Sequence, residues 1–232
     1  MGANNKTARI AGFIYLLVVI CGLFDIMYVP SKIIIWNDPA ATVKNLAASE
    51  WLFRSAIAVN IINHILFILL PLVLYKLFKS VKEEYAFLMV LLALISIPVS
   101  YNLIIKELDI INLIDASKIP PNIQPEILQS QVMSLFNSYY NGFLICQIFW
   151  GLWLLPLGVL VIKSGFLPKL IGIFLILGCL GYLFDSFGRI FSANYYDYFN
   201  SGLVLLPASF GEIGLCLWLL IAGIKVPQTK TI

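Results

Sequence analysis

Six separate stretches of the chain are each long and apolar enough to cross a lipid bilayer as a helix. About 20 residues are needed, because an α-helix rises about 1.5 Å per residue. Composition agrees: 61% of the 232 residues are apolar and 12% are charged, against about 45–50% and about 25% in ordinary globular domains. These values exclude a soluble domain and a disordered chain. They predict an all-α, polytopic membrane helix bundle that forms a single transmembrane domain over residues 1–232. The six expected spans are residues 10–29, 53–75, 85–105, 142–162, 168–190 and 203–224.

The distribution of basic residues predicts that both termini are cytoplasmic. With the N-terminus inside, more Lys and Arg residues flank the inner ends of the spans than the outer ends, as the positive-inside rule requires. An even number of spans then returns the C-terminus to the same side.

Local signals predict where several helices begin and end. Asp38 followed by Pro39 is typical of an N-cap with proline in the first turn, and it predicts a short surface helix before the second span. Gly165 suits a helix C-cap. The apolar spacing in residues 125–142 predicts a helix on the outer membrane surface before the fourth span. Four prolines lie inside expected spans, where each can kink its helix: Pro71, Pro98, Pro156 and Pro207.

Ionisable side chains inside the spans require an explanation. Each costs about 2.5–3.5 kcal/mol on insertion scales, and each needs a partner or a water-filled cavity. All of them fall in the predicted outer half of the membrane. Asp185 and Arg189 are four residues apart and share a helix face, as do Asn60 and His64. We therefore predict one outward-facing polar pocket. Its candidate residues are Asp25, Arg54, Asn60, Asn63, His64, Gln147, Asp185, Arg189 and Glu212.

These residues leave three functional interpretations open. In the first, a non-enzymatic protein binds, transports or senses a small molecule or lipid, and Arg54 and Arg189 contact an anionic headgroup or solute. In the second, a structural or assembly protein uses its polar groups only to hold the bundle together. In the third, Glu212 and Asp185 are the acid and base of an intramembrane enzyme. No pattern in the chain assigns a catalytic residue or names a substrate.

Other chemistry is excluded by residue counts. One histidine rules out a His-rich zinc site, and four cysteines in separate apolar runs without a C-x-x-C pattern make a redox pair unexpected. We expect no cofactor and no metal site. A net charge of +3 is too small for nucleic-acid binding. The expected partners are the lipid bilayer, a lipid or small anionic ligand, and further copies of the chain in a homo-oligomer.

The stretch from residue 142 to residue 187 resembles the bacterial family called domain of unknown function 4386. The segments ARIAGFIYLLVVICGLF, ASEWLFRSAI and GEIGLCLWLLIAGI fit the same family, so the resemblance covers nearly the whole chain. It implies a six-helix integral protein of the bacterial cytoplasmic membrane, and it implies no function. Members often carry a histidine before the fourth helix, where this chain has Tyr139 and Tyr140. The residues that match the family pattern are Arg54, Gly165, Pro168, Asp185 and Glu212.

Overall fold

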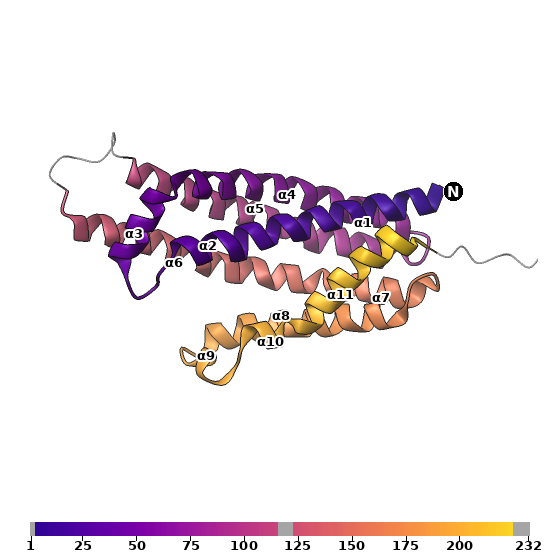
Figure 1. The fold of residues 1–232 in the computed structure, drawn as a ribbon. Coiled ribbons are helices and arrows are strands. Elements are labelled where there is room, and N and C mark those ends of the chain that lie inside the picture. The colour runs from indigo at the N-terminus through magenta and orange to yellow at the C-terminus, as the bar shows by residue number, and fades with distance from the viewer. Residues whose placement is uncertain (1–2, 116–122, 225–232) are drawn as a thin grey trace, which may run out of the picture. The chain divides into compact units, whose positions relative to one another are not determined.

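The computed structural model describes residues 3–115 and 123–224, and all regular structure in those two ranges is helical (Figure 1). The all-α prediction is therefore confirmed for this part of the chain. The elements are α1 (Ala3–Gly22), a π-helical segment η1 (Leu23–Tyr28), α2 (Val29–Ile33), α3 (Pro39–Ala48), α4 (Glu50–Phe78), α5 (Glu83–Ile114), α6 (Pro125–Leu152), α7 (Leu154–Ser164), α8 (Lys169–Phe191), α9 (Tyr195–Tyr198), α10 (Ser201–Val204), α11 (Leu206–Leu217) and a second π-helical segment η2 (Trp218–Ala222).

The chain divides into two compact units. The first unit comprises Met1–Leu17, Leu66–Ile97 and Ile145–Ile232, and the second unit comprises Val18–Ile65 and Pro98–Leu144.

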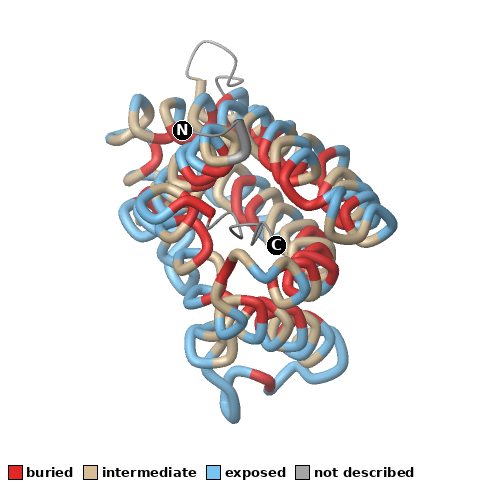
Figure 2. Tube along the Cα trace, turned by 90° about the vertical axis from the view of Figure 1, so that its right-hand side faces the viewer, coloured by how far each residue is buried: buried red, intermediate tan, exposed pale blue. Residues whose placement is uncertain are grey.

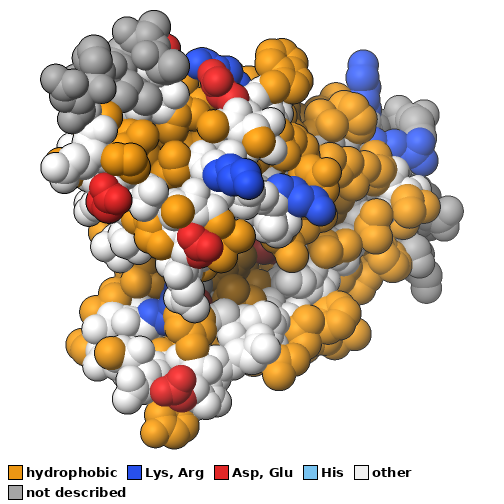
Figure 3. All heavy atoms as spheres, turned by 60° about the vertical axis from the view of Figure 1, so that its left-hand side comes forward, with side chains coloured by type: hydrophobic (Ala, Val, Ile, Leu, Met, Phe, Trp, Pro, Cys, Tyr) orange, Lys and Arg blue, Asp and Glu red, His pale blue; other side chains and the backbone are white. Residues whose placement is uncertain are grey.

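Within the two described ranges, five helical segments are long and apolar enough to cross a membrane. They are Asn5–Ile33, Glu50–Phe78, Glu83–Ile114, Pro125–Ser164 and Lys169–Phe191. The sixth expected span, residues 203–224, contains a shorter apolar helix, Leu206–Ala222. Large hydrophobic side chains are exposed along these helices, for example Phe13, Phe87 and Leu170, and Figure 3 shows hydrophobic side chains covering much of one face. Such exposure is unusual in a soluble monomer and suits contact with lipid.

The first long helix changes its winding around Asp25. The N–H of Val29 donates to the carbonyl of Phe24, five residues back, at the end of segment η1. Pro30 explains this change, because proline has no N–H and its ring clashes with the carbonyl four residues earlier. The wider π turn accommodates the proline, and the helix then continues to Ile33. The first helical segment is therefore longer than the span expected at residues 10–29.

The four intramembrane prolines behave in two ways. Pro71 and Pro98 lie inside the uninterrupted helices α4 and α5. Pro156 and Pro207 instead lie in the first turns of α7 and α11. Proline is tolerated in a first turn because the N–H groups there have no intrahelical acceptor. At these two positions the chain ends one helix and begins another.

The prediction of a separate surface helix over residues 125–142 is wrong. The structure has one continuous helix, α6, from Pro125 to Leu152. Gly142 lies within this helix and does not end it, and a Cβ added there would meet the end of the flexible Leu103 side chain of α5. The apolar face of this segment is buried in the second unit, where Val132 and Phe136 join a core with Phe53 of α4.

Two local predictions are confirmed. Asp38 caps α3, and its Oδ1 accepts a hydrogen bond of 2.9 Å from the N–H of Ala41. Gly165 ends α7 with φ +69°, the left-handed conformation in which glycine is favoured. Pro168 immediately precedes α8 and serves as its N-cap.

In the first unit, small residues allow neighbouring helices to approach closely. α8 packs against both α7 and α11. Gly158 of α7 and Gly172 of α8 face each other, and a Cβ on either would come within 2.7 Å of the other's carbonyl oxygen. Small residues at such crossings are characteristic of helix pairs in membranes. Figure 2 shows buried positions recurring along the helices of the chain. The tight packing of α8 against α7 and α11 fixes the position of the α8 side chains described below.

Candidate functional site

The nine predicted site residues fall into two groups, one in each unit. The first unit contains Gln147, Asp185, Arg189 and Glu212. The second unit contains Asp25, Arg54, Asn60, Asn63 and His64.

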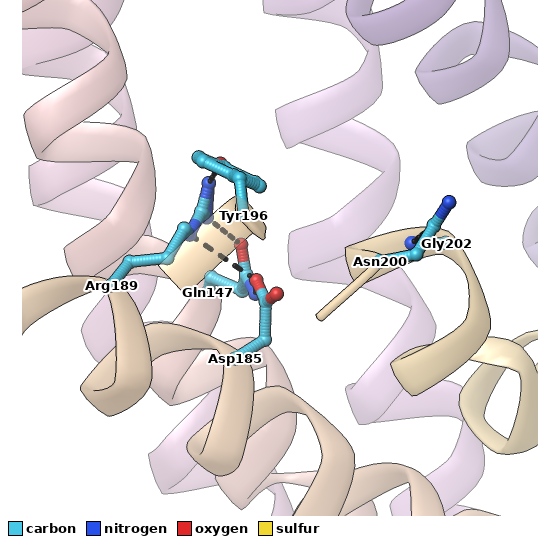
Figure 4. Close-up of polar contacts among 6 residues, drawn as sticks. All are labelled: Gln147, Asp185, Arg189, Tyr196, Asn200 and Gly202. Atoms are coloured by element: carbon cyan, nitrogen blue, oxygen red, sulfur yellow. Dashed lines mark hydrogen bonds and ion pairs between the residues drawn. The ribbon is translucent and has the colours of Figure 1, made fainter. Parts of the chain in front are cut away.

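Three of the first group form one hydrogen-bonded cluster, which we call the Arg189 cluster: Gln147, Asp185 and Arg189 (Figure 4). Arg189 Nε lies 3.3 Å from Asp185 Oδ2 one turn earlier on α8, so the predicted i, i+4 pairing is confirmed. Gln147 of α6 joins both residues. Its Nε2 donates to Asp185 Oδ2 at 2.7 Å, and its Oε1 accepts from Arg189 Nη2 at 2.9 Å.

Arg189 makes a further contact beyond the end of α8. Its Nη1 donates to the hydroxyl of Tyr196 in α9 at 2.6 Å. The Asp185 side chain is 1% exposed, whereas that of Arg189 is 20% exposed. The carboxylate is thus enclosed, and the guanidinium extends from it toward the surface of the unit. Asp185 Oδ1 has no hydrogen-bond partner within the described part of the chain.

The pKa of Tyr195 is raised, mainly by burial and in smaller part by Asp185 of this cluster. Its side chain is buried, and burial raises the pKa of the phenol to about 12, with a smaller contribution from the Asp185 carboxylate. A phenol in these surroundings stays neutral at physiological pH, so the ionic character of the cluster comes from Asp185 and Arg189.

Glu212 has a different partner from the Arg189 cluster. Its Oε1 accepts a hydrogen bond of 2.8 Å from the hydroxyl of Tyr15 in α1. The Tyr15 ring is 2% exposed and lies 6.1 Å from that of Trp153. Tyr15 is absent from the predicted site. A tyrosine near the middle of an apolar span was the available signal, since a buried phenol usually requires a hydrogen-bond partner.

In the second unit, the predicted polar stripe on α4 is connected to a residue that sequence reasoning missed. Asn60 Nδ2 donates to Glu107 Oε2 at 3.3 Å, and His64 Nδ1 lies 2.8 Å from the Asn60 carbonyl oxygen. Glu107 is buried. It was missed because the third span was expected to end at residue 105, whereas α5 continues to Ile114.

The remaining members of the second group differ in exposure. Arg54 forms an ion pair of 2.7 Å with Glu50, and both side chains are more than 40% exposed. The i, i+4 pairing is as expected, but Arg54 is a surface residue of its unit. Asp25 is 5% exposed, and neither its Oδ1 nor the Oδ1 of Asn63 has a hydrogen-bond partner in the described ranges.

Metal binding by the usual ligand groups finds no support in the described ranges. No group of three or more His, Cys, Asp or Glu residues there is arranged to hold a metal ion.

The described helices and their buried polar clusters define a class: all-helical proteins whose helices are long and apolar enough to cross a membrane and enclose ionisable side chains. Within that class, the chain belongs to the family described as "Domain of unknown function (DUF4386)", whose model matches residues 10–223. The resemblance noted from the sequence is thereby confirmed.

One similar protein is an uncharacterized protein of Archaeoglobus fulgidus, 30% identical over 95 residues. The match covers 40% of this chain and 52% of the relative, so the chain spans about half of that protein's length. No solved structure matches the chain.

Proposed function

We propose that this protein is a six-span integral protein of the bacterial cytoplasmic membrane, with both termini cytoplasmic, that binds the anionic group of a lipid or small molecule at Arg189. Transport or sensing of that ligand would follow from such binding. The observation that carries the proposal is the geometry of the Arg189 cluster. Its guanidinium is oriented by a buried carboxylate and an amide, and the Arg189 side chain as a whole is 20% exposed.

The chemistry of arginine suits this ligand class. The guanidinium is a planar fork that matches phosphate and carboxylate oxygens, and it is charged at all relevant pH values. Asp185 and Gln147 hold the fork in place, so little side-chain freedom is lost on binding. Asp185 compensates the charge of Arg189 within the protein.

The protein contact of the guanidinium that a ligand could most easily replace is the one made to an exposed residue. Nη1 is held by Tyr196, a side chain that is 62% exposed on a short helix. An anionic oxygen can replace the phenol at Nη1 without breaking the buried contacts of Asp185. Tyr196 would then either turn away or contact the ligand.

A structural role is the second candidate, and one observation favours it. Nη1 and Nη2 of the Arg189 guanidinium already donate hydrogen bonds to protein partners, and Nε lies 3.3 Å from Asp185 Oδ2. A cluster of this kind would hold α6 to α8 without any ligand.

Native mass spectrometry of gently extracted protein distinguishes the two candidates. We expect a stoichiometric phospholipid or anionic metabolite on the wild type, and at least tenfold lower occupancy on Arg189→Ala. Arg54→Ala is the matched control, because it removes a guanidinium from an exposed ion pair and should retain the ligand. Bare wild-type protein, with Arg189→Ala merely less stable, would support the structural role. The mass of the ligand distinguishes a lipid headgroup from a free anion.

A further inference from the structure

A small cavity in the second unit is lined by two carboxyl groups that the Arg189 cluster does not involve. Asp25 of η1 and Glu107 of α5 both line it, and their side chains are each 5% exposed. Both carboxyl groups therefore border the same space. No Lys, Arg or His among the described residues forms an ion pair with either of them, so neither carboxyl group has a protein counterion there.

Asp25 has a carboxyl oxygen that accepts no hydrogen bond in the described ranges, and Glu107 accepts only a long one. Asp25 Oδ1 is buried and has no hydrogen-bond partner in the described ranges. Glu107 receives one long hydrogen bond, 3.3 Å from Asn60 Nδ2. A buried acceptor without a donor is destabilising, and two neighbouring carboxylates in an apolar enclosure repel each other. A bound cation with N–H donors would relieve both effects.

The rest of the lining indicates what kind of cation fits. Aromatic rings of Phe53, Phe136, Tyr139 and Tyr140 border the cavity. A metal ion such as Ca²⁺ requires six to eight oxygen ligands, and this lining is too apolar to supply them. An ammonium group is satisfied by a few charged acceptors and by contact with aromatic faces.

The size of the cavity limits which ammonium groups it can hold. The space available to the centres of water molecules is about 20 Å³, little more than the roughly 10–15 Å³ that one water molecule needs. A primary ammonium head fits this space, and a bulky quaternary ammonium does not. We propose that the cavity binds the ammonium group of a small primary amine through Asp25 and Glu107.

The π-helical winding of η1 supports the site. It places Asp25 at a position of the helix where the regular hydrogen-bond pattern is interrupted by Pro30. Such π segments frequently occur at functional sites. Pro30 itself lines the cavity, so the residue that causes the altered winding also borders the proposed ligand.

Equilibrium dialysis of the purified full-length protein with radiolabelled methylammonium tests this proposal. We expect saturable binding to the wild type, and at least tenfold weaker binding by Asp25→Asn and by Glu107→Gln. Asp109→Asn is the matched control, because it removes a carboxyl from the same helix, α5, outside the cavity lining, and it should bind like the wild type. Tetramethylammonium should not compete.

A second measurement needs no variant, so it holds even if the carboxyl substitutions prevent folding. Dicyclohexylcarbodiimide modifies carboxyl groups in apolar surroundings, and peptide mass spectrometry reads the modification at Glu107. We expect saturating methylammonium to slow this modification at least fivefold in the wild type. Absence of methylammonium binding, an unchanged modification rate, or stronger protection by Na⁺ or Ca²⁺ than by methylammonium would overturn the proposal. Neither experiment involves Arg189, so its result is independent of the function proposed above.

Discussion

Replacing Gly172 by alanine should loosen the contact between α7 and α8. The new Cβ would lie 2.6 Å from the carbonyl oxygen of Gly158, a distance that real Cβ atoms essentially never show. A backbone oxygen cannot turn aside as a flexible side chain can, so the two helices must separate. Overpacking of this kind typically costs about 1–3 kcal/mol.

Comparison with a second glycine separates the effect of packing on the free energy of unfolding from the effect of helix propensity. Alanine gains up to about 1 kcal/mol over glycine inside a helix, which offsets part of the packing cost at Gly172. The same gain applies to Gly214→Ala in α11, where the new Cβ would lie 3.8 Å from Ile171 in ordinary contact. The free energy of unfolding of Gly172→Ala should therefore be about 1–3 kcal/mol lower than that of Gly214→Ala.

Reversible unfolding in mixed detergent micelles measures this difference. Gly158→Ala should be destabilised to a similar extent, because its Cβ would lie 2.7 Å from the Gly172 carbonyl oxygen. The double variant should lose less than the sum of the two single losses, since one separation of the helices relieves both clashes. Equal stabilities of Gly172→Ala and Gly214→Ala, or strict additivity at the two facing glycines, would refute the packing argument.

Two further predictions concern tyrosines of the first unit. Tyr15→Phe removes the hydroxyl that donates a 2.8 Å hydrogen bond to the Glu212 carboxyl, so the free energy of unfolding should fall by about 1–2 kcal/mol. In a Glu212→Leu protein, which lacks the acceptor, Tyr15→Phe should lower the free energy of unfolding far less. An equal loss in the wild type and in Glu212→Leu would contradict this contact. The pKa of Tyr195 is raised from 10.0 to about 12 in the folded protein. Between these values the unfolded chain has lost a proton that the folded chain retains, so stability should fall as pH rises from about 10 to about 12. Tyr195→Phe should show a shallower fall over the same range, and identical pH profiles of the two proteins would argue against the shift.

Features set by local chemistry could be predicted from the sequence. The apolar runs indicate the long helices, Asp38 and Gly165 mark helix ends, and Asp185 and Arg189 pair because a helix places residues four apart on one face. Each of these depends on the periodicity or conformation of a single segment. The structure agrees with each of them.

Contacts between helices could not be predicted in the same way. Gln147 was selected only as a polar residue in a span, and nothing in the sequence indicated that it joins Asp185 to Arg189. The Tyr15–Glu212 contact joins residues 197 positions apart. Such pairings depend on the rotation of each helix about its axis, which small residues and prolines alter.

The error over residues 125–142 has a related cause. An apolar stripe at helical spacing suits a helix on a membrane surface and a helix packed in a core equally well. Val132 and Phe136 have core partners supplied by other segments, and no property of the stripe itself reveals them.

Ligand-dependent stability of the wild type and Arg189→Ala tests the proposed binding role most directly. The probes are a short-chain phosphatidylglycerol and, in a parallel arm, inorganic phosphate, each titrated during unfolding of the purified protein. A ligand present at 100 times its dissociation constant stabilises the folded state by about 2.7 kcal/mol. We predict stabilisation of this order for the wild type by at least one probe, and none for Arg189→Ala. If neither probe stabilises the wild type while Arg189→Ala has a lower baseline stability, Arg189 only holds helices together and the binding role is contradicted.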